Sequence, residues 1–210
     1  MHPNPAFCGA TASANLAFAR ARGFGLVTVN GPRGPLAAHV PFVLSDSGDT
    51  AHLHLVRSNP LLAAIGAPAP ALLAVSGPDG YVSPDWYGLP DQVPTWNYVA
   101  VHLRGTLQRL PDDQLDSVLA ALSAAFEARL APKPAWTADK MNRVALERMM
   151  RAIVPVRLTI ENVDGTWKLS QNKPDVARRA AVDAMQASVG PELAALSALM
   201  RQWDDGSSSK

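Results

Sequence analysis

The N-terminal part of the chain alternates between short β-type stretches and turns rich in Gly, Pro, Asn and Asp. Residues 24–30 and 36–44 flank the turn 31–34, and residues 50–56 follow the polar segment 45–49. Turn residues between apolar, β-branched runs are typical of hairpins, so we expect three antiparallel strands here. Because these strands follow one another without intervening helices, the pattern favours a small antiparallel barrel over a doubly wound sheet.

Further strands are expected along the rest of the chain. Residues 71–76 form a buried apolar run that the turn-type sequence 77–80 is expected to end. Residues 96–108 have the pattern of one long strand, and residues 156–160 alternate in hydropathy before the turn 164–165. Six or seven strands of this kind predict a mainly β fold, a split β-barrel with peripheral helices.

The predicted helices lie outside the strand-rich segments. An Ala-rich helix is expected at 13–22, a second helix follows Asp112, and a third covers 139–151. Beyond Pro174 the sequence predicts two helices divided at 190–191. The helix after Asp112 carries apolar residues at helical spacing that are expected to be core, namely Leu115, Val118, Leu119, Leu122, Phe126 and Leu130.

Composition predicts one domain that buries a single core. The chain has 210 residues, of which 48% are apolar, so we expect one domain over 1–205 and a disordered tail over 206–210. The single cysteine, Cys8, cannot form an intrachain disulfide, which favours a reducing, cytoplasmic location. The longest uncharged stretch, 58–78, is interrupted by Gly and Pro, so no membrane span is expected.

The charge balance makes direct binding to DNA doubtful. Nineteen basic residues oppose 18 acidic residues, which gives a net charge of +1. Non-specific nucleic-acid binding needs a strongly basic surface, and the small basic spot expected on the helix after Pro174 consists of Arg178 and Arg179. The sequence contains no P-loop and no His-Glu-x-x-His helix. Two histidines on one predicted strand face, His52 and His54, have no nearby acidic partners, which favours a structural role over metal binding.

Aromatic and polar side chains are concentrated in the middle of the chain, over 81–87 and 93–102. Aromatic rings beside amide and hydroxyl groups suit a flat heteroaromatic ligand. The candidate binding residues in these segments are Trp86, Thr95, Trp96 and Asn97. The alternative is that the rings on the predicted strand fill the core or a dimer interface.

Two further polar clusters stand where a strand gives way to a helix. One contains Lys168, Ser170, Gln171 and Asn172, and the other contains Arg57, Ser58 and Asn59. Cationic and amide donors near a helix start suit an anionic group such as a phosphate. The alternatives are that the first cluster only caps the next helix and that Arg57 is a solvated strand end.

The residues of these clusters resemble a known family. The matching segments are 39–42, 54–60, 81–87, 93–102, 150–154 and 168–172. In this order they are similar to the PaiB-like family of FMN-binding negative transcriptional regulators. The resemblance covers nearly the whole chain.

The resemblance implies a split barrel related to the pyridoxine phosphate oxidase-like flavoproteins, assembled as a homodimer with FMN between the subunits. The FMN phosphate is then expected near Arg57, Ser58 and Lys168, and the ring near the region from Trp86 to Asn97. A half-open barrel would also leave strand edges exposed in a monomer, which favours an obligate dimer. The implied function is regulatory, and the alternative is a flavin-dependent oxidoreductase, because a bound flavin itself carries redox chemistry.

Overall fold

The computed structural model describes residues 2–207, and these residues form two compact units. The barrel unit consists of Leu16–Val75 and His102–Val163. The terminal unit consists of the described residues in 2–15, 76–101 and 164–207. The expectation of one domain over 1–205 stays a prediction.

The first three strands form the antiparallel meander that the turn pattern predicted. They are β1 (Phe24–Gly31), β2 (Gly34–Leu44) and β3 (Thr50–Val56). In the hairpin register Phe24 lies opposite Pro41, and Gly31 lies opposite Gly34. Gly34 has φ +124°, which is a conformation that L side chains rarely adopt, so a glycine suits this turn.

Three long strands complete the barrel, which closes in the order β1-β2-β3-β6-β5-β4. They are β4 (Ala69–Val82), β5 (Thr95–Arg109) and β6 (Ile153–Lys168). β4 pairs with β1 and β6 pairs with β3, so the prediction of a half-open barrel with exposed strand edges is wrong. The core of the barrel unit holds fully buried leucines, namely Leu53, Leu73, Leu103, Leu107 and Leu158.

Two predicted turns are wrong, because strands run through both. β4 continues through 77–80, and β6 continues through 164–165. A Cβ at Gly80 would lie 2.8 Å from Leu193 Cδ2, and a Cβ at Gly165 would lie 2.1 Å from Asn15 Oδ1. These glycines therefore allow neighbouring elements to approach a strand closely and do not form turns.

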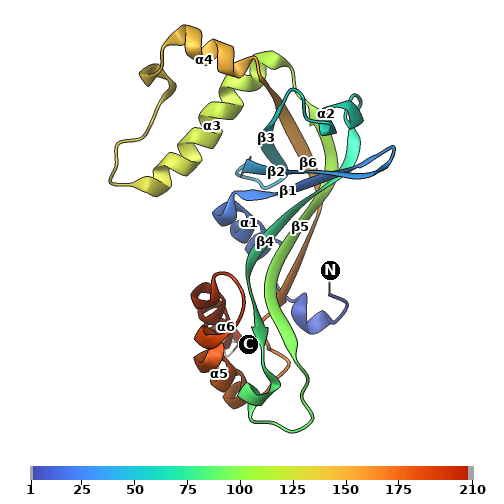
Figure 1. The fold of residues 1–210 in the computed structure, drawn as a ribbon, viewed down its shortest axis with the longest axis vertical. Coiled ribbons are helices and arrows are strands. Elements are labelled where there is room, and N and C mark those ends of the chain that lie inside the picture. Colours follow the sequence, from blue (N-terminus) through green and yellow to red (C-terminus); the bar gives the residue numbers. More distant parts are fainter. Residues whose placement is uncertain (1, 208–210) are drawn as a thin grey trace. The chain divides into compact units, whose positions relative to one another are not determined.

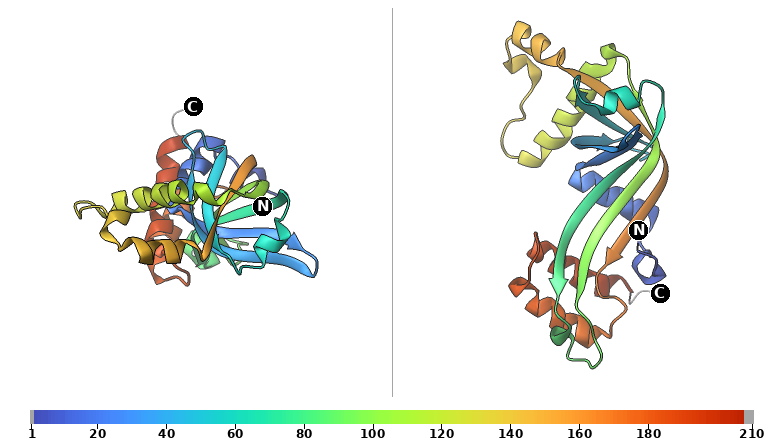
Figure 2. Two further views of the ribbon diagram at one scale, coloured as in Figure 1. Left: turned by 90° about the horizontal axis from the view of Figure 1, so that it is seen from above. Right: turned by 45° about the vertical axis from the view of Figure 1, so that its right-hand side comes forward.

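Four helices belong wholly or partly to the barrel unit, in which α3 packs against β2 and β3 (Figures 1 and 2). They are α1 (Ala12–Arg22), α2 (Leu61–Ala64), α3 (Leu115–Glu127) and α4 (Arg143–Met150). α4 begins later than predicted because Asn142 caps it, accepting hydrogen bonds from Val144 N and Ala145 N. Short 3-10 helices of this unit are η3 (Asp112–Gln114), η4 (Ala128–Leu130) and η5 (Ala138–Lys140).

The apolar stripe of α3 is core only in part. Leu115, Val118 and Leu122 are buried. Leu119 and Phe126 are only partly buried, and Leu130 is 53% exposed, so its assignment to the core is wrong. Leu130 lies beyond the C-terminus of α3, in η4, where the helical periodicity no longer applies.

The terminal unit contains the two C-terminal helices that the sequence predicted, α5 (Asp175–Ala184) and α6 (Leu193–Ser207). α5 packs against α6 and against η2 (Pro84–Tyr87), and the remaining short helices are η1 (Pro5–Phe7) and η6 (Met185–Ala187). The predicted tail begins within α6, and residues 208–210 lie outside the described part of the chain. Among the described residues, no helix combines the length and the apolar character that crossing a membrane requires.

Candidate functional site

A buried polar cluster forms in the terminal unit around Ser170. The hydroxyl groups of Tyr87 and Ser170 are 2.6 Å apart, and Asn97 Nδ2 donates to Ser170 Oγ over 2.8 Å. Asn97 is fully buried, and within the described structure its Oδ1 atom has no hydrogen-bond partner. Burial raises the pKa of the Tyr87 phenol, so this group stays neutral at physiological pH. The cluster therefore holds one buried acceptor without a partner among the described residues.

Two lysines bring positive charge to the same unit. Lys168 Nζ donates a hydrogen bond to Thr95 Oγ1 and lies 5.9 Å from the centre of the Phe7 ring. Lys173 Nζ donates to Gln92 Oε1 and lies 5.4 Å from the centre of the Tyr87 ring. Burial, and then the positive charge of Lys173, lower the pKa of Lys168. Among the described residues no carboxylate pairs with Lys168, so an anion bound here would relieve an unfavourable charge.

The predicted aromatic residues are placed at the edge of this unit. Trp96 is 41% exposed, and its Nε1 donates to Asp79 Oδ1 over 2.8 Å. The Tyr81 ring meets the Trp96 ring edge-on, with centroids 6.4 Å apart. Trp86 lies partly buried in η2. The alternative that Trp96 fills the core of this chain is therefore wrong.

One alternative was that the segment after β6 only caps the next helix, and this alternative is wrong. The N-cap of α5 is Pro174, and no side chain makes a capping hydrogen bond there. Instead Gln171 folds back on its own segment, because its Oε1 accepts from Leu169 N at 2.7 Å and its Nε2 donates to Trp167 O. Asn172 is exposed.

The third predicted group, Arg57 to Asn59, lies in the barrel unit between β3 and α2. Arg57 Nε donates to Arg151 O at 2.9 Å, and its Nη2 donates to Ile153 O at 3.1 Å and to Asp112 Oδ2 at 3.3 Å. Asn59 Oδ1 accepts from Leu61 N at 3.0 Å, and Ser58 is exposed. The guanidinium of Arg57 thus fastens the end of β3 to the start of β6, in addition to any ligand contact.

Asp112 connects Arg57 to a second arginine. Arg109 Nη2 donates to Asp112 Oδ1 at 2.9 Å. The hydrogen bond from Arg109, followed by the charges of Arg109 and Arg57, holds the pKa of Asp112 below its usual range. Arg57 therefore shares one carboxylate with Arg109, whereas no described carboxylate pairs with Lys168.

The structure sorts the predicted residues into two groups, one in each unit. In the terminal unit it brings Thr95 to Lys168 and Asn97 to Ser170. Three participants were not among the predicted site residues, namely Tyr87, Gln92 and Lys173. Tyr87 and Lys173 lie inside or directly beside the polar segments that the sequence singled out, so their chemical type was a usable signal.

The basic spot predicted for α5 is wrong. Arg178 is buried at 4% exposure, and its Nη2 donates to Asp175 Oδ1 at 2.8 Å. A helical residue faces the core or the solvent according to how its helix packs, and α5 turns Arg178 inward against its neighbours. Only Arg179 of the pair is exposed.

The family described as "Putative FMN-binding domain" matches residues 1–162 of the chain. The chain belongs to this family. The predicted cofactor, FMN, and the predicted PaiB-like family are thereby confirmed. The matched residues include the Arg57 group and the strand from Thr95 to Asn97, and they end before Lys168.

Known proteins resemble the chain in sequence and in fold. The Bacillus subtilis protein "Protease synthase and sporulation protein PAI 2" is 28% identical over 185 residues, which cover 87% of this chain and 88% of that protein. The FAD and heme binding protein from Mycobacterium smegmatis superimposes with a TM-score of 0.53 at 22% identity, covering 79% of this chain and 74% of that one. The flavocytochrome Anf3 from Azotobacter vinelandii has a TM-score of 0.53 at 17% identity, with coverages of 80% and 72%. These structures confirm the predicted split-barrel fold.

Proposed function

We propose that this protein is a cytoplasmic, homodimeric flavoprotein of regulatory function that holds FMN with Lys168 and Lys173 against its phosphate. The observation that carries the proposal is the pair of ammonium groups in the terminal unit. Lys168 is partly buried beside a second cation, and its described surroundings hold no carboxylate to neutralise it. A phosphate supplies that missing charge.

The other side chains of the terminal unit fit the rest of an FMN molecule. Thr95 offers a hydroxyl beside Lys168, and the buried Asn97 next to it on the same strand supports this edge of the site through Ser170. The exposed Trp96 offers a ring face for stacking against a flat heterocycle. When bound, FMN supplies the electron-transfer chemistry, while these residues bind and orient it. The other predicted contacts of this unit, from Trp86, Ser170, Gln171 and Asn172, stay part of this proposal. The predicted contacts of the barrel unit, from Arg57, Ser58 and Asn59, stay a separate prediction.

The regulatory part of the proposal does not require contact with DNA. The net charge is +1, and Arg178 is buried and paired with Asp175. A protein that recognises DNA directly must neutralise several phosphates, and a near-neutral chain is poorly suited to that. The name of the Bacillus subtilis relative refers to protease synthesis and sporulation, which favours a regulatory role exerted through flavin chemistry or a protein partner.

Exposed apolar side chains support the homodimer. Phe24 and Trp96 are exposed by 53% and 41%, and Met149 by 56%. Covering a large apolar side chain with a partner removes it from water and stabilises the assembly. We propose that a second copy covers some of these side chains and that FMN lies at the subunit interface. Sedimentation of the protein at micromolar concentration tests this, and a monomer that binds FMN would contradict it.

An FMN titration of the Lys168→Met variant tests the binding site. Loss of a charge-assisted contact is expected to weaken FMN binding by about 1.5–3 kcal/mol, which is roughly ten- to a hundredfold. The matched control is Arg33→Met, which removes one exposed positive charge from the turn between β1 and β2. Equal affinity in the Lys168→Met variant and in the unmodified protein would remove Lys168 from the site.

A second measurement separates regulation from catalysis. The FMN-loaded protein is mixed with NADH or NADPH in air, and the consumption of the nicotinamide is followed by absorbance. A yellow protein without turnover is the expected result. Steady turnover would instead identify the protein as a flavin-dependent oxidoreductase.

A further inference from the structure

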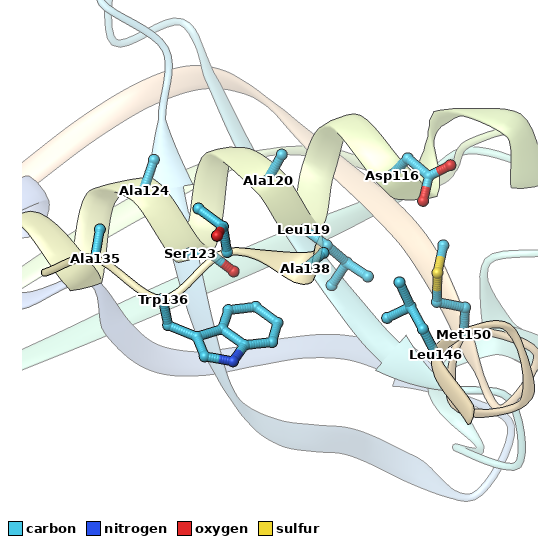
Figure 3. A pocket seen from close by; sticks show the side chains of 11 residues that line it. Asp116, Leu119, Ala120, Ser123, Ala124, Ala135, Trp136, Ala138, Leu146 and Met150 are labelled. Atoms are coloured by element: carbon cyan, nitrogen blue, oxygen red, sulfur yellow. The ribbon is translucent and has the colours of Figure 1, made fainter. Parts of the chain in front are cut away.

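The barrel unit contains an apolar cavity of about 440 Å³ that lies beside α3. Figure 3 shows Leu119 and Ser123 of α3 and Trp136 of the following loop around it, with Leu146 and Met150 of α4 at one end. Pockets of 300–1,000 Å³ with mostly apolar walls and a few polar groups are typical sites for small molecules. The polar side chains here are Asp116, Ser123 and Thr137.

A neighbouring cavity of about 290 Å³ shares three of these wall residues, Leu119, Ser123 and Trp136. It also reaches His54 of β3 and Glu127 of α3. Within the described structure the buried Nδ1 atom of His54 has no hydrogen-bond partner. Burial lowers the pKa of His54, so the ring is neutral at physiological pH and offers one donor and one acceptor.

The loop that carries Trp136 is fastened to α3. Glu127 Oε2 accepts a hydrogen bond from the Trp136 backbone N–H at 2.8 Å and also pairs with Lys133 Nζ. The pKa of Glu127 is lowered first by Lys133 and then by the Trp136 N–H, so the carboxylate stays ionised. Lys140 Nζ donates at 2.8 Å to Ala135 O, the carbonyl of the same peptide group. The backbone that carries the indole is therefore held in place before any ligand arrives, which lowers the cost of binding.

The charges of the two cavities set them apart from the FMN site. Their walls include two carboxylates, Asp116 and Glu127, and no lysine or arginine is among the described residues that line them. A carboxylate wall repels an anion such as a phosphate. The lining therefore favours an uncharged ligand and disfavours FMN.

We propose that these neighbouring cavities bind an uncharged aromatic molecule of two or three rings that carries an N–H or O–H group. Its rings pack against Trp136 and Leu119, and its polar hydrogen pairs with a ring nitrogen of His54. This site is separate from the FMN site of the proposed function, so either assignment can fail without the other.

Binding of N-phenyl-1-naphthylamine to the full-length, FMN-loaded protein tests the proposal. This probe is neutral, has three aromatic rings and one N–H, and its binding is followed by fluorescence and calorimetry. We expect saturable binding of one probe per chain in the presence of FMN. The Ser123→Phe variant, which places a ring in both cavities, should bind it at least about tenfold more weakly, because the filled space no longer buries the probe.

The matched control is Ala121→Phe, which places the same ring on an exposed position of α3 that lines neither cavity. This variant should bind the probe like the unmodified protein. Equal affinity in both variants, the absence of saturable binding, or displacement of the probe by FMN would overturn the proposal. Conversion of a dimer to a monomer by Ser123→Phe would also overturn it, because the second copy would then cover the cavities.

The hydrogen bond is tested with a second pair of molecules. N-phenyl-1-naphthylamine is compared with 1-phenylnaphthalene, which has the rings but no N–H. The unmodified protein should prefer the amine by several fold, the typical value of one neutral hydrogen bond. His54→Leu should abolish that preference while it leaves binding of the hydrocarbon intact. A preference that survives in His54→Leu would remove His54 from the site.

Discussion

Lys168 and Arg57 are both cations that follow or end a strand, yet their surroundings differ in kind. Lys168 in the terminal unit contacts a threonine hydroxyl and an aromatic ring. Arg57 in the barrel unit contacts two backbone carbonyl groups and the carboxylate of Asp112. Among the described residues no carboxylate pairs with Lys168, whereas Arg57 shares the carboxylate of Asp112 with Arg109.

The difference shows that residue type alone does not define an anion site. An arginine held by a carboxylate and by carbonyl groups stabilises its own fold, and it has fewer donors free for a ligand. A partly buried lysine without a carboxylate is unfavourable until an anion arrives. The terminal unit is therefore the better candidate for the phosphate, and the Arg57 group is the better candidate for a structural clamp.

The largest effect is expected from Ser170→Ala in the buried cluster of the terminal unit. This substitution removes the partner of the Tyr87 hydroxyl and leaves Asn97 Nδ2 with only the Met200 sulfur, 3.6 Å away. An unpaired buried polar group costs about 1–3 kcal/mol of unfolding free energy. Urea unfolding measures the loss. The matched control is Ser58→Ala, an exposed serine of the Arg57 group, which should change stability by less than about 0.5 kcal/mol. Similar losses in the two variants would break the contrast between the groups.

A smaller effect is expected from Arg57→Ala on FMN affinity. The guanidinium already donates to two backbone carbonyl groups and to Asp112, so few of its donors are open to a ligand. The net loss should therefore stay below about 1.5 kcal/mol, which is roughly tenfold. Titrations of the Arg57→Ala and Lys168→Met variants with FMN compare how much each cation contributes to FMN affinity. A greater loss in Arg57→Ala than in Lys168→Met would reverse their roles.

The lowered pKa of Lys168 gives the FMN-free protein a dependence of stability on pH. The unfolded chain holds the proton up to the ordinary value of 10.5, whereas the folded chain releases it earlier. The unfolded state therefore binds more protons in the window just below 10.5, and the unfolding free energy rises with pH there. Denaturation curves of the unmodified protein and of Lys168→Met should differ in this slope. Identical slopes would show that Lys168 is fully solvated.

The smallest effect is expected from Asp112→Asn. The lowered pKa of Asp112 means that its carboxylate stabilises the fold above the ordinary value of 3.8 and that this contribution disappears as the pH falls below it. Because Asp112 and both arginines are well exposed, the loss at neutral pH should be below about 1 kcal/mol. Thermal unfolding at pH 7 and at pH 3 measures it. A loss that persists unchanged at pH 3 would exclude the ion pairs as its cause.

Local sequence was sufficient for the hairpins and the start of α3, because turn residues and periodicity act over a few positions. It failed at Gly80 and Gly165, where glycine serves a close approach from α6 or from Asn15. Those partners lie far away in the chain, so the residues 77–80 looked like an ordinary turn. The prediction that Arg178 lies at the surface failed for the same reason. Only the packing of α5 against distant elements decides which side of the helix is buried.

The candidate site was predictable in its chemistry and not in its pairing. The polar segments around Trp96 and Lys168 stood out by composition, and the structure brings Thr95 and Asn97 to the second of these segments. The pairing of Arg57 with Asp112 could not be predicted, because only the folded barrel brings these two residues, 55 positions apart, into contact. The cavity beside α3 gave no sequence signal, since its walls consist of common residues such as Leu119 and Ser123.

The way the two units share the chain has a consequence for synthesis on the ribosome. All segments of the barrel unit have been translated once Val163 is reached, whereas the terminal unit needs residues from Asp164 onward. Tyr87 precedes its partner Ser170 by 83 residues. At about 5–20 residues per second, about 4–17 seconds pass between the addition of Tyr87 and the addition of Ser170. The ribosome therefore adds the last residue of the barrel unit before it adds the two lysines proposed for the phosphate.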